Sequence, residues 1–130
     1  MKSRVWLPGI EVESKQHSRS YSRTGRTFTN HAYERARDTL GIMARLALTR
    51  KGWPSPVETK VIMRMSYRGR FDVDNAAGFV MDALQGVAYV RDSQVVCLTV
   101  RKRLDGALGI LIALSTIEDR PGRHRPEHQT

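Results

Sequence analysis

The sequence VETKVIMRMSYRGRFDVDNAAGFVMDAL, residues 57–84, contains the two patterns that decide the fold. From residue 57 to residue 68, apolar and polar side chains largely alternate, which predicts a half-buried β-strand. From about Asp74 to Gly86, apolar residues recur on one side of a helix, which predicts a short helical segment. Its buried side consists of Phe79, Val80, Ala83 and Leu84. A strand that leads into a helix predicts a sheet with helices packed on it.

The residues before this stretch predict one more strand and one more helix. Residues 5–12 are mildly apolar, and Pro8 and Gly9 among them favour an edge strand or an extended entry segment. Apolar residues then recur at intervals of three and four, which is typical of an amphipathic helix from an N-cap at Thr29 or Asn30 to about Lys51. These apolar residues are Tyr33, Ala36, Leu40, Met43 and Ala47.

The residues after it predict two further strands. Residues 94–103 form one, residues 108–114 form the other, and a turn at Asp105 and Gly106 predicts that the two pair as a β-hairpin. The whole order predicts a single α/β (α+β) domain over residues 1–117, with two main helices packed on a small mixed β-sheet. Residues 118–130 are polar and are predicted to form a disordered tail.

The charge of the chain favours a polyanionic partner. Its 130 residues include 22 Lys and Arg against 13 Asp and Glu, which gives a net charge of +9 and a pI near 10.4. Binding of cations to phosphates releases condensed counterions, so nucleic acid is the expected partner. No apolar run is long enough for a membrane span. A single cysteine, Cys97, and the lack of a signal-peptide pattern predict a cytoplasmic protein without a disulfide framework.

The polar segment 13–28 carries four spaced cations: Lys15, Arg19, Arg23 and Arg26. It reads equally well as a solvated surface loop and as a loop that clasps DNA phosphates. The arginines of the first predicted helix lie mostly off its apolar stripe, which favours a solvated face over a DNA-reading one.

Four aspartates fall between residues 72 and 92, where Arg91 is the one basic residue. In an extended chain, Asp72 and Asp74 point to the same side, and Asp92 precedes a strand that can return alongside them. Carboxylates held this close repel each other, and a divalent cation relieves the repulsion. Oxygen ligands without histidine or thiol suit Mg²⁺ or Mn²⁺, which can polarise a phosphodiester and activate a water. Nearby Arg68, Arg70 and Arg91 can hold phosphates.

Each aspartate also has a structural interpretation. Asp74 can be the N-cap of its helix, which is worth about 1 kcal/mol. Asp72 can be a turn residue, and Asp82 can be an exposed helical charge that supports the helix. The sequence leaves these alternatives open for any single aspartate.

The spacing Asp72-Val-Asp74-Asn75, then Asp82-Ala-Leu84, Tyr89 and Asp92-Ser-Gln94-Val95, resembles the core signature of RusA-type Holliday junction resolvases. The resemblance covers about residues 19–103 and is strongest from 70 to 95. It implies a homodimer that binds four-way DNA junctions in recombination and repair, and that cuts them with Mg²⁺ or Mn²⁺. By position, Asp72, Asp74 and Asp92 match the family's essential carboxylates, and Asn75 and Gln94 match residues kept beside them.

Two positions depart from the family pattern. The family carries a lysine four residues after the second aspartate, and this chain has Gly78 there. Lys15, Arg70 and Lys102 are candidates to replace that cation, and the sequence does not choose among them. The N-terminal segment also lacks the family's Pro-Pro-Ser-Asn-like loop.

Three alternatives to an active resolvase remain at this point. Gly78 favours a DNA-binding protein of the same fold that no longer cuts. Glu13-Ser14-Lys15 fits the acidic-x-Lys element of restriction-type nucleases, although it precedes the aspartates. A basic RNA-binding protein also fits the charge but leaves the aspartate cluster unexplained.

Overall fold

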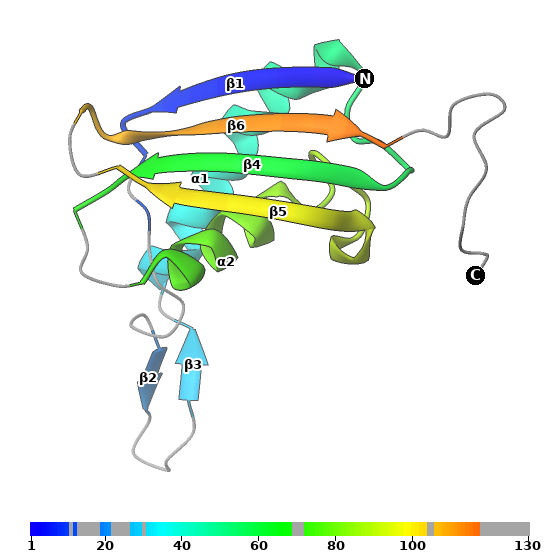
Figure 1. The fold of residues 1–130 in the computed structure, drawn as a ribbon. Coiled ribbons are helices and arrows are strands. Elements are labelled where there is room, and N and C mark those ends of the chain that lie inside the picture. The colour runs from blue at the N-terminus through cyan, green and yellow to red at the C-terminus, as the bar shows by residue number, and fades with distance from the viewer. Residues whose placement is uncertain are drawn as a thin grey trace, which may run out of the picture.

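The centre of the fold is a four-stranded mixed sheet in the order β1-β6-β4-β5 (Figure 1). The computed structural model describes residues 1–10, 12, 19–21, 27–29, 31–68, 72–103 and 106–117. The strands are β1 (Lys2–Pro8), β4 (Thr59–Ser66), β5 (Val95–Lys102) and β6 (Gly109–Thr116). Strand β6 is antiparallel to β1 and β4, whereas β5 is parallel to β4. The predicted mixed sheet, and β1 as an edge strand, are therefore confirmed.

Two helices, α1 (His31–Leu48) and α2 (Val73–Leu84), cover one face of the sheet (Figure 1). A 3₁₀ turn, Thr49–Lys51, extends α1 to the end predicted from the sequence. Gly52 then adopts a φ of 92°, a left-handed conformation that glycine adopts at little cost, and its N–H bonds back to the carbonyl of Thr49. The two predicted helices are confirmed.

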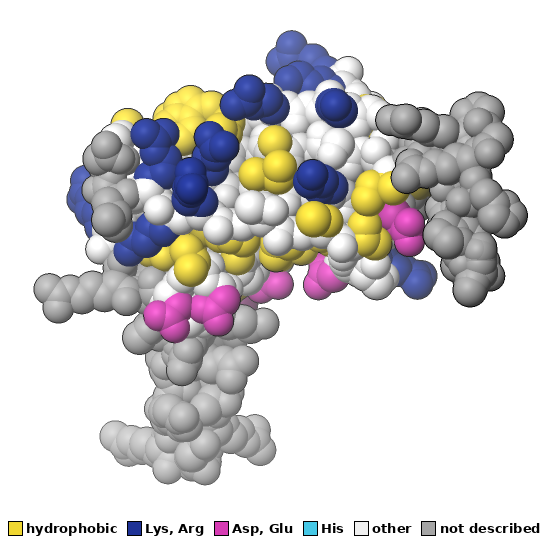
Figure 2. Space-filling model, in the orientation of Figure 1, with side chains coloured by type: hydrophobic (Ala, Val, Ile, Leu, Met, Phe, Trp, Pro, Cys, Tyr) yellow, Lys and Arg dark blue, Asp and Glu magenta, His cyan; other side chains and the backbone are white. Residues whose placement is uncertain are grey.

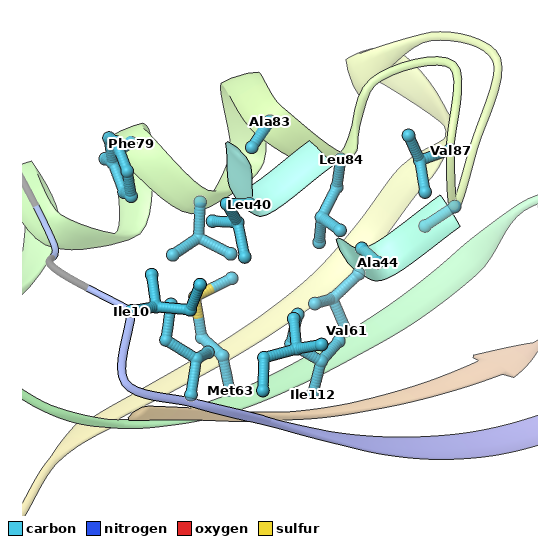
Figure 3. Packing of buried hydrophobic residues seen from close by; sticks show 14 of the residues in the cluster. Ile10, Leu40, Ala44, Val61, Met63, Phe79, Ala83, Leu84, Val87 and Ile112 are labelled. Atoms are coloured by element: carbon cyan, nitrogen blue, oxygen red, sulfur yellow. The ribbon is translucent and has the colours of Figure 1, made fainter. Parts of the chain in front are cut away.

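The core lies between these helices and the sheet. Alternate residues of β4, including Val61 and Met63, are fully buried and belong to the same hydrophobic cluster as Leu40 of α1 and Phe79 of α2 (Figure 3). Burial of each such side chain contributes about 1.5–3 kcal/mol. Buried residues recur every two positions in β4 and about every 3.6 positions in the helices, and they face this layer. The sequence patterns therefore identified the core residues.

The predicted β-hairpin between residues 94–103 and 108–114 is wrong. Strand β4 lies between β5 and β6, and pairs with both. Strand β5 follows β4 through the helical crossover of α2, the connection that parallel neighbours require. The segment after β5 then passes β4 to reach β6, since the most buried strand needs a neighbour on each side.

The polar segment 13–28 holds more than the loop predicted. Arg19–Tyr21 (β2) and Thr27–Thr29 (β3) form a separate two-stranded antiparallel sheet. The positions of Lys15, Arg23 and Arg26 lie outside the described residues, as do residues 118–130, so the predicted disordered tail remains a prediction.

The two faces of the main sheet differ sharply in what covers them. The helices cover one face, and the opposite face has no helix over it in the described structure (Figure 1). Lys and Arg side chains are spread over this open face, and acidic side chains gather along its lower margin (Figure 2). In the described residues, neither helix has the length and hydrophobicity needed to cross a bilayer.

Candidate metal and DNA site

Asp72 and Asp74 flank the first residue of α2. Asp72 takes the N-cap position with extended backbone angles (φ −66°, ψ 159°), whereas Asp74 is already helical. The expectation that both lie in extended chain is therefore wrong, because the helix starts at Val73. The N-cap interpretation of Asp74 is also wrong, and the Asp72 side chain makes no capping hydrogen bond. Both side chains are exposed, which leaves carboxylate oxygens accessible at the helix start.

Tyr67, at the end of the segment that contains β4, is influenced by both carboxylates and contacts a cation. Burial raises the pKa of Tyr67, and the negative charges of Asp72 and then Asp74 raise it further. The ammonium of Lys102 lies 4.2 Å from the centre of the Tyr67 ring. Lys102 pairs with the buried Met65 across β4 and β5, so it lies on the helix-covered side of the sheet. Lys102 therefore contacts the Tyr67 ring, and the charges of Asp72 and Asp74 act on the pKa of the same tyrosine.

Asp92 begins a 3₁₀ turn, Asp92–Gln94, directly before β5. The Gln94 side chain fixes this turn: its carbonyl oxygen accepts hydrogen bonds from the backbone N–H groups of Val90 and Arg91, both at 2.9 Å. Its amide nitrogen donates to the carbonyl oxygens of Ser55 (2.7 Å) and Val57 (2.9 Å). The supporting role expected of Gln94 thus has a concrete form, which is the attachment of the Asp92 turn to the segment before β4.

The structure separates Asp92 from the other two aspartates within one chain. Thr59 at the start of β4 pairs with Val95 at the start of β5, so Asp92 lies near the beginning of β4. Asp72 follows the end of β4, one strand length away. An eight-residue strand spans about 23 Å, and the twelve-residue helix α2 about 18 Å.

The tyrosines report the same separation. Burial raises the pKa of Tyr89, and the next contributions come from Asp92 and Asp82, whereas Tyr67 responds to Asp72 and Asp74. No group of three His, Cys, Asp or Glu side chains that could hold a metal ion exists among the described residues. The expected convergence of the three aspartates is therefore not found inside one chain.

The remaining predicted site residues are placed as follows. Arg68 and Arg91 are exposed. The backbone N–H of Asn75 donates to Asp74 Oδ1 at 3.0 Å. Arg19 belongs to β2, and Lys15, Arg23, Arg26 and Arg70 lie outside the described residues.

Two residues of α2, Gly78 and Asp82, bear on how the site is interpreted. Gly78 is exposed, and a Cβ atom there would meet nothing within 4 Å, so the fold does not require glycine at this position. Asp82 accepts a 2.7 Å hydrogen bond from the Tyr33 hydroxyl, which ties α2 to α1 and agrees with a structural role.

Sequence reasoning missed Tyr67 as a site residue. Its position in the alternating strand pattern accounted for it as a half-buried strand residue, so nothing marked it as a partner of the aspartates. Only its place five residues before Asp72 gave a signal, and that signal is weak.

The chain matches a known protein family. The family described as "Endodeoxyribonuclease RusA" matches residues 9–115, a wider span than the 19–103 expected. The match includes every described residue of the site. No curated protein matches the chain.

Proposed function

The chain belongs to the RusA endodeoxyribonuclease family, whose members act on Holliday junctions, and from this premise we propose that it is a Mg²⁺-dependent enzyme that resolves four-way DNA junctions. The observation that carries the proposal is the pair of exposed carboxylates at the start of α2, Asp72 and Asp74, in a chain of net charge +9. Two carboxylates held close together repel each other, and a bound divalent cation relieves that repulsion.

Asp72 and Asp74 fit a hard divalent cation, because both offer carboxylate oxygens, are exposed, and adjoin no histidine or thiol in the described structure. Mn²⁺ is expected to substitute for Mg²⁺. When bound, such an ion supplies Lewis-acid activation of a phosphodiester and of water. The chain's own contribution is to place the two carboxylates together at a fixed helix start.

The third carboxylate is proposed to come from a second copy of the chain. Strand β5 is an edge strand, and its Val96 and Leu98 are large exposed apolar residues. Such an edge readily pairs with another strand. If two β5 edges pair antiparallel about a twofold axis, the beginning of one strand lies beside the end of the other. The partner subunit's Asp92 then approaches Asp72 and Asp74, which one chain alone cannot achieve.

Lys102 is proposed to replace the family lysine missing at Gly78. Its ammonium lies over the ring of Tyr67, which precedes Asp72 by five residues in the sequence. From there its ammonium can hold the phosphate that is cut. The exposed Arg68 and Arg91, and the cations predicted in segment 13–28, are proposed to bind the neighbouring DNA backbone.

A second candidate function is a junction-binding protein that no longer cuts. Gly78 favours it, because glycine supplies no cation where the family has one. The open space around Gly78 makes this alternative testable, since a Cβ atom added there would meet nothing within 4 Å.

The test is cleavage of a synthetic four-way junction with Mg²⁺ or Mn²⁺ by the native chain, Asp74→Asn and Gly78→Lys. The proposal expects that the native chain cuts the junction and that Asp74→Asn does not, although the native chain and Asp74→Asn both bind it. Removal of the metal by EDTA should abolish cutting. If Gly78→Lys alone cuts, the binding-protein alternative is correct. Cutting by Asp74→Asn would refute the assignment of Asp74.

A further inference from the structure

The open face of the sheet carries two rows of cations, one on β1 and one on β4, that the proposed nuclease site does not use. On β1, Lys2 and Arg4 alternate with the buried Val5 and Leu7, so they point away from the core. On β4, Lys60 and Arg64 alternate in the same way with fully buried residues. These cations make no ion pair with any described residue, and the four strands contain no Asp or Glu within the bounds given above.

Between these two rows lies a shallow depression that we call the basic trough. Its floor is β6, the strand between β1 and β4, which presents small or medium side chains to this face. Three adjoining hollows of about 790, 260 and 320 Å³ follow it, and they share Arg4, Arg64 and Leu111 between neighbours. The trough consists of Lys2, Arg4, Lys60, Ile62, Arg64, Leu111, Ala113 and Ser115.

Trp6 stands at one end of the basic trough. Its indole is 48% exposed, an unusual state for so large an apolar side chain. The ring is nevertheless held in place, because a Cβ atom added to Gly109 would lie 2.5 Å from its Cη2 atom, so the ring rests directly on the glycine backbone. An exposed, positioned aromatic ring beside cations is the combination on which proteins stack unpaired bases.

We propose that the basic trough binds a single DNA strand, whose phosphates lie between the two rows of cations and one of whose bases stacks on Trp6. The width favours one strand over a duplex: β1 and β4 are two strand spacings apart, about 10 Å, which is less than the major groove of B-DNA alone, about 12 Å. A second copy of the chain is a poor occupant, because two such basic faces repel each other.

This inference goes beyond the proposed nuclease function. The basic trough lies on the face of the sheet opposite to α2 and uses none of the three aspartates. The strand that it binds is therefore a different segment from the one held at the carboxylates. The trough provides binding whether or not the protein cuts DNA.

The test is fluorescence anisotropy with a labelled oligothymidylate of about 10 nucleotides, in EDTA so that no metal site contributes. The variant Arg4→Glu/Arg64→Glu is compared with Arg35→Glu/Arg45→Glu, which changes two exposed arginines of α1 and alters the net charge equally. We expect about tenfold or greater loss for the first variant, and a fall of about 1.4 in the slope of log affinity against log salt. The control variant is expected to lose far less.

Trp6 gives an independent readout. Trp6→Ala is expected to weaken binding by about fivefold to a hundredfold, and Trp6→Phe to retain most of it. Binding should quench tryptophan emission in the native chain and not in Trp6→Phe, whose remaining tryptophan, Trp53, is buried. Thermal melts identify any variant that fails to fold, and the charge variants test the trough without changing Trp6.

Three outcomes would overturn the inference, and a fourth would separate it from the nuclease proposal. Equal loss in the two charge-reversal pairs would mean that only net charge matters. Unchanged oligonucleotide binding, with a change in sedimentation instead, would assign the face to self-association. Binding of anionic lipid vesicles without binding of the oligonucleotide would assign it to a membrane. A native chain that binds the oligonucleotide through the trough but does not cut junctions would refute the nuclease proposal and leave this one standing.

Discussion

The two ends of helix α2 are built in different ways. At its C-terminal end, the Gln94 side chain makes four hydrogen bonds, and the Tyr89 hydroxyl donates to the Met81 carbonyl at 2.8 Å. Asp92 thus lies in a turn that the hydrogen bonds of the Gln94 side chain hold to neighbouring segments. At its N-terminal end, Asp72 and Asp74 are positioned by where the helix begins, and the Asp72 side chain makes no capping hydrogen bond.

If the proposed metal site is correct, one chain carries two incomplete sites. The start of α2 has two carboxylates, and the third lies in the hydrogen-bonded Asp92 turn, about a helix length away. A rigidly held ligand far from its partners is of use only if a second molecule brings the other half. The comparison between the two ends therefore leads directly to experiments on mixed dimers.

The largest expected effect comes from removing one carboxylate at either end. Asp74→Asn and Asp92→Asn should each lose about a thousandfold or more in junction cleavage, since metal binding supplies several kcal/mol of transition-state stabilisation. An equal mixture of the two variants should recover activity, because each mixed dimer retains one intact composite site. About a quarter of all sites would be intact under random mixing, and their products would be nicked junctions.

A mixture as inactive as its components would contradict the composite site. The control is a mixture of Asp72→Asn and Asp74→Asn, which remove ligands from the same half. This mixture should stay inactive, because no mixed dimer then contains a complete site.

Lys102 offers a smaller effect confined to the N-terminal end. Lys102→Ala should reduce cleavage about tenfold to a hundredfold, because one cation is lost from the phosphate that is cut. The double variant Lys102→Ala/Gly78→Lys should regain most of this activity, since the space around Gly78 is open. Single-turnover cleavage rates measure both. Full activity in Lys102→Ala would show that another cation serves the site.

Gln94 tests the rigidity of the C-terminal end. Gln94→Ala leaves two backbone N–H groups and two carbonyl oxygens without their side-chain partner, and should lower the free energy of unfolding by about 1–3 kcal/mol. Cleavage should fall as well, because the Asp92 turn is released. Urea unfolding is compared with that of Asn75→Ala, whose side chain makes no such bridge in the described structure, and cleavage rates are compared with those of the native chain. Equal stabilities of Gln94→Ala and Asn75→Ala would contradict the role of Gln94.

The smallest effect is a difference in tyrosine titration between the two ends. Asp74→Asn should lower the pKa of Tyr67 and leave Tyr89 unchanged, whereas Asp92→Asn should do the reverse. Both tyrosines have raised pKa values in the folded chain, mainly because of burial. Their contribution to stability is therefore present below pH 10.0 and is lost as the pH rises through the folded values. NMR titration of the tyrosine rings measures both pKa values, and a shift of both by one variant would contradict the separation.

The sequence predicted most of the elements because their signals are local. The alternation in β4 and the apolar stripes of α1 and α2 each depend on a burial period that a single segment displays. The predicted hairpin failed for the opposite reason. Strand pairing depends on which neighbours a buried strand needs, and no pattern within residues 94–114 records that β4 lies between the two strands.

The same division holds for the candidate site. Residue type and spacing singled out Asp72, Asp74 and Asp92, because acidic side chains in a basic chain stand out at once, whereas Gln94 came from the family resemblance. Their positions in space did not follow from spacing, since β4 and β5 run parallel and put the beginning of β5 at the far end from Asp72. The surroundings of Tyr67 and the basic trough could not be predicted for a related reason, because each depends on residues from different strands that lie side by side.

The amino-acid sequence by itself determined the chemistry of this protein, namely its basic charge, its carboxylates, and a core period that sets one sheet and two helices. The tertiary structure decided which of those groups can act together. Side-chain chemistry is a property of single residues, whereas proximity depends on strand order and direction. The parallel β4–β5 pair therefore separated the aspartates, and the open face of the same sheet aligned cations that lie far apart along the chain.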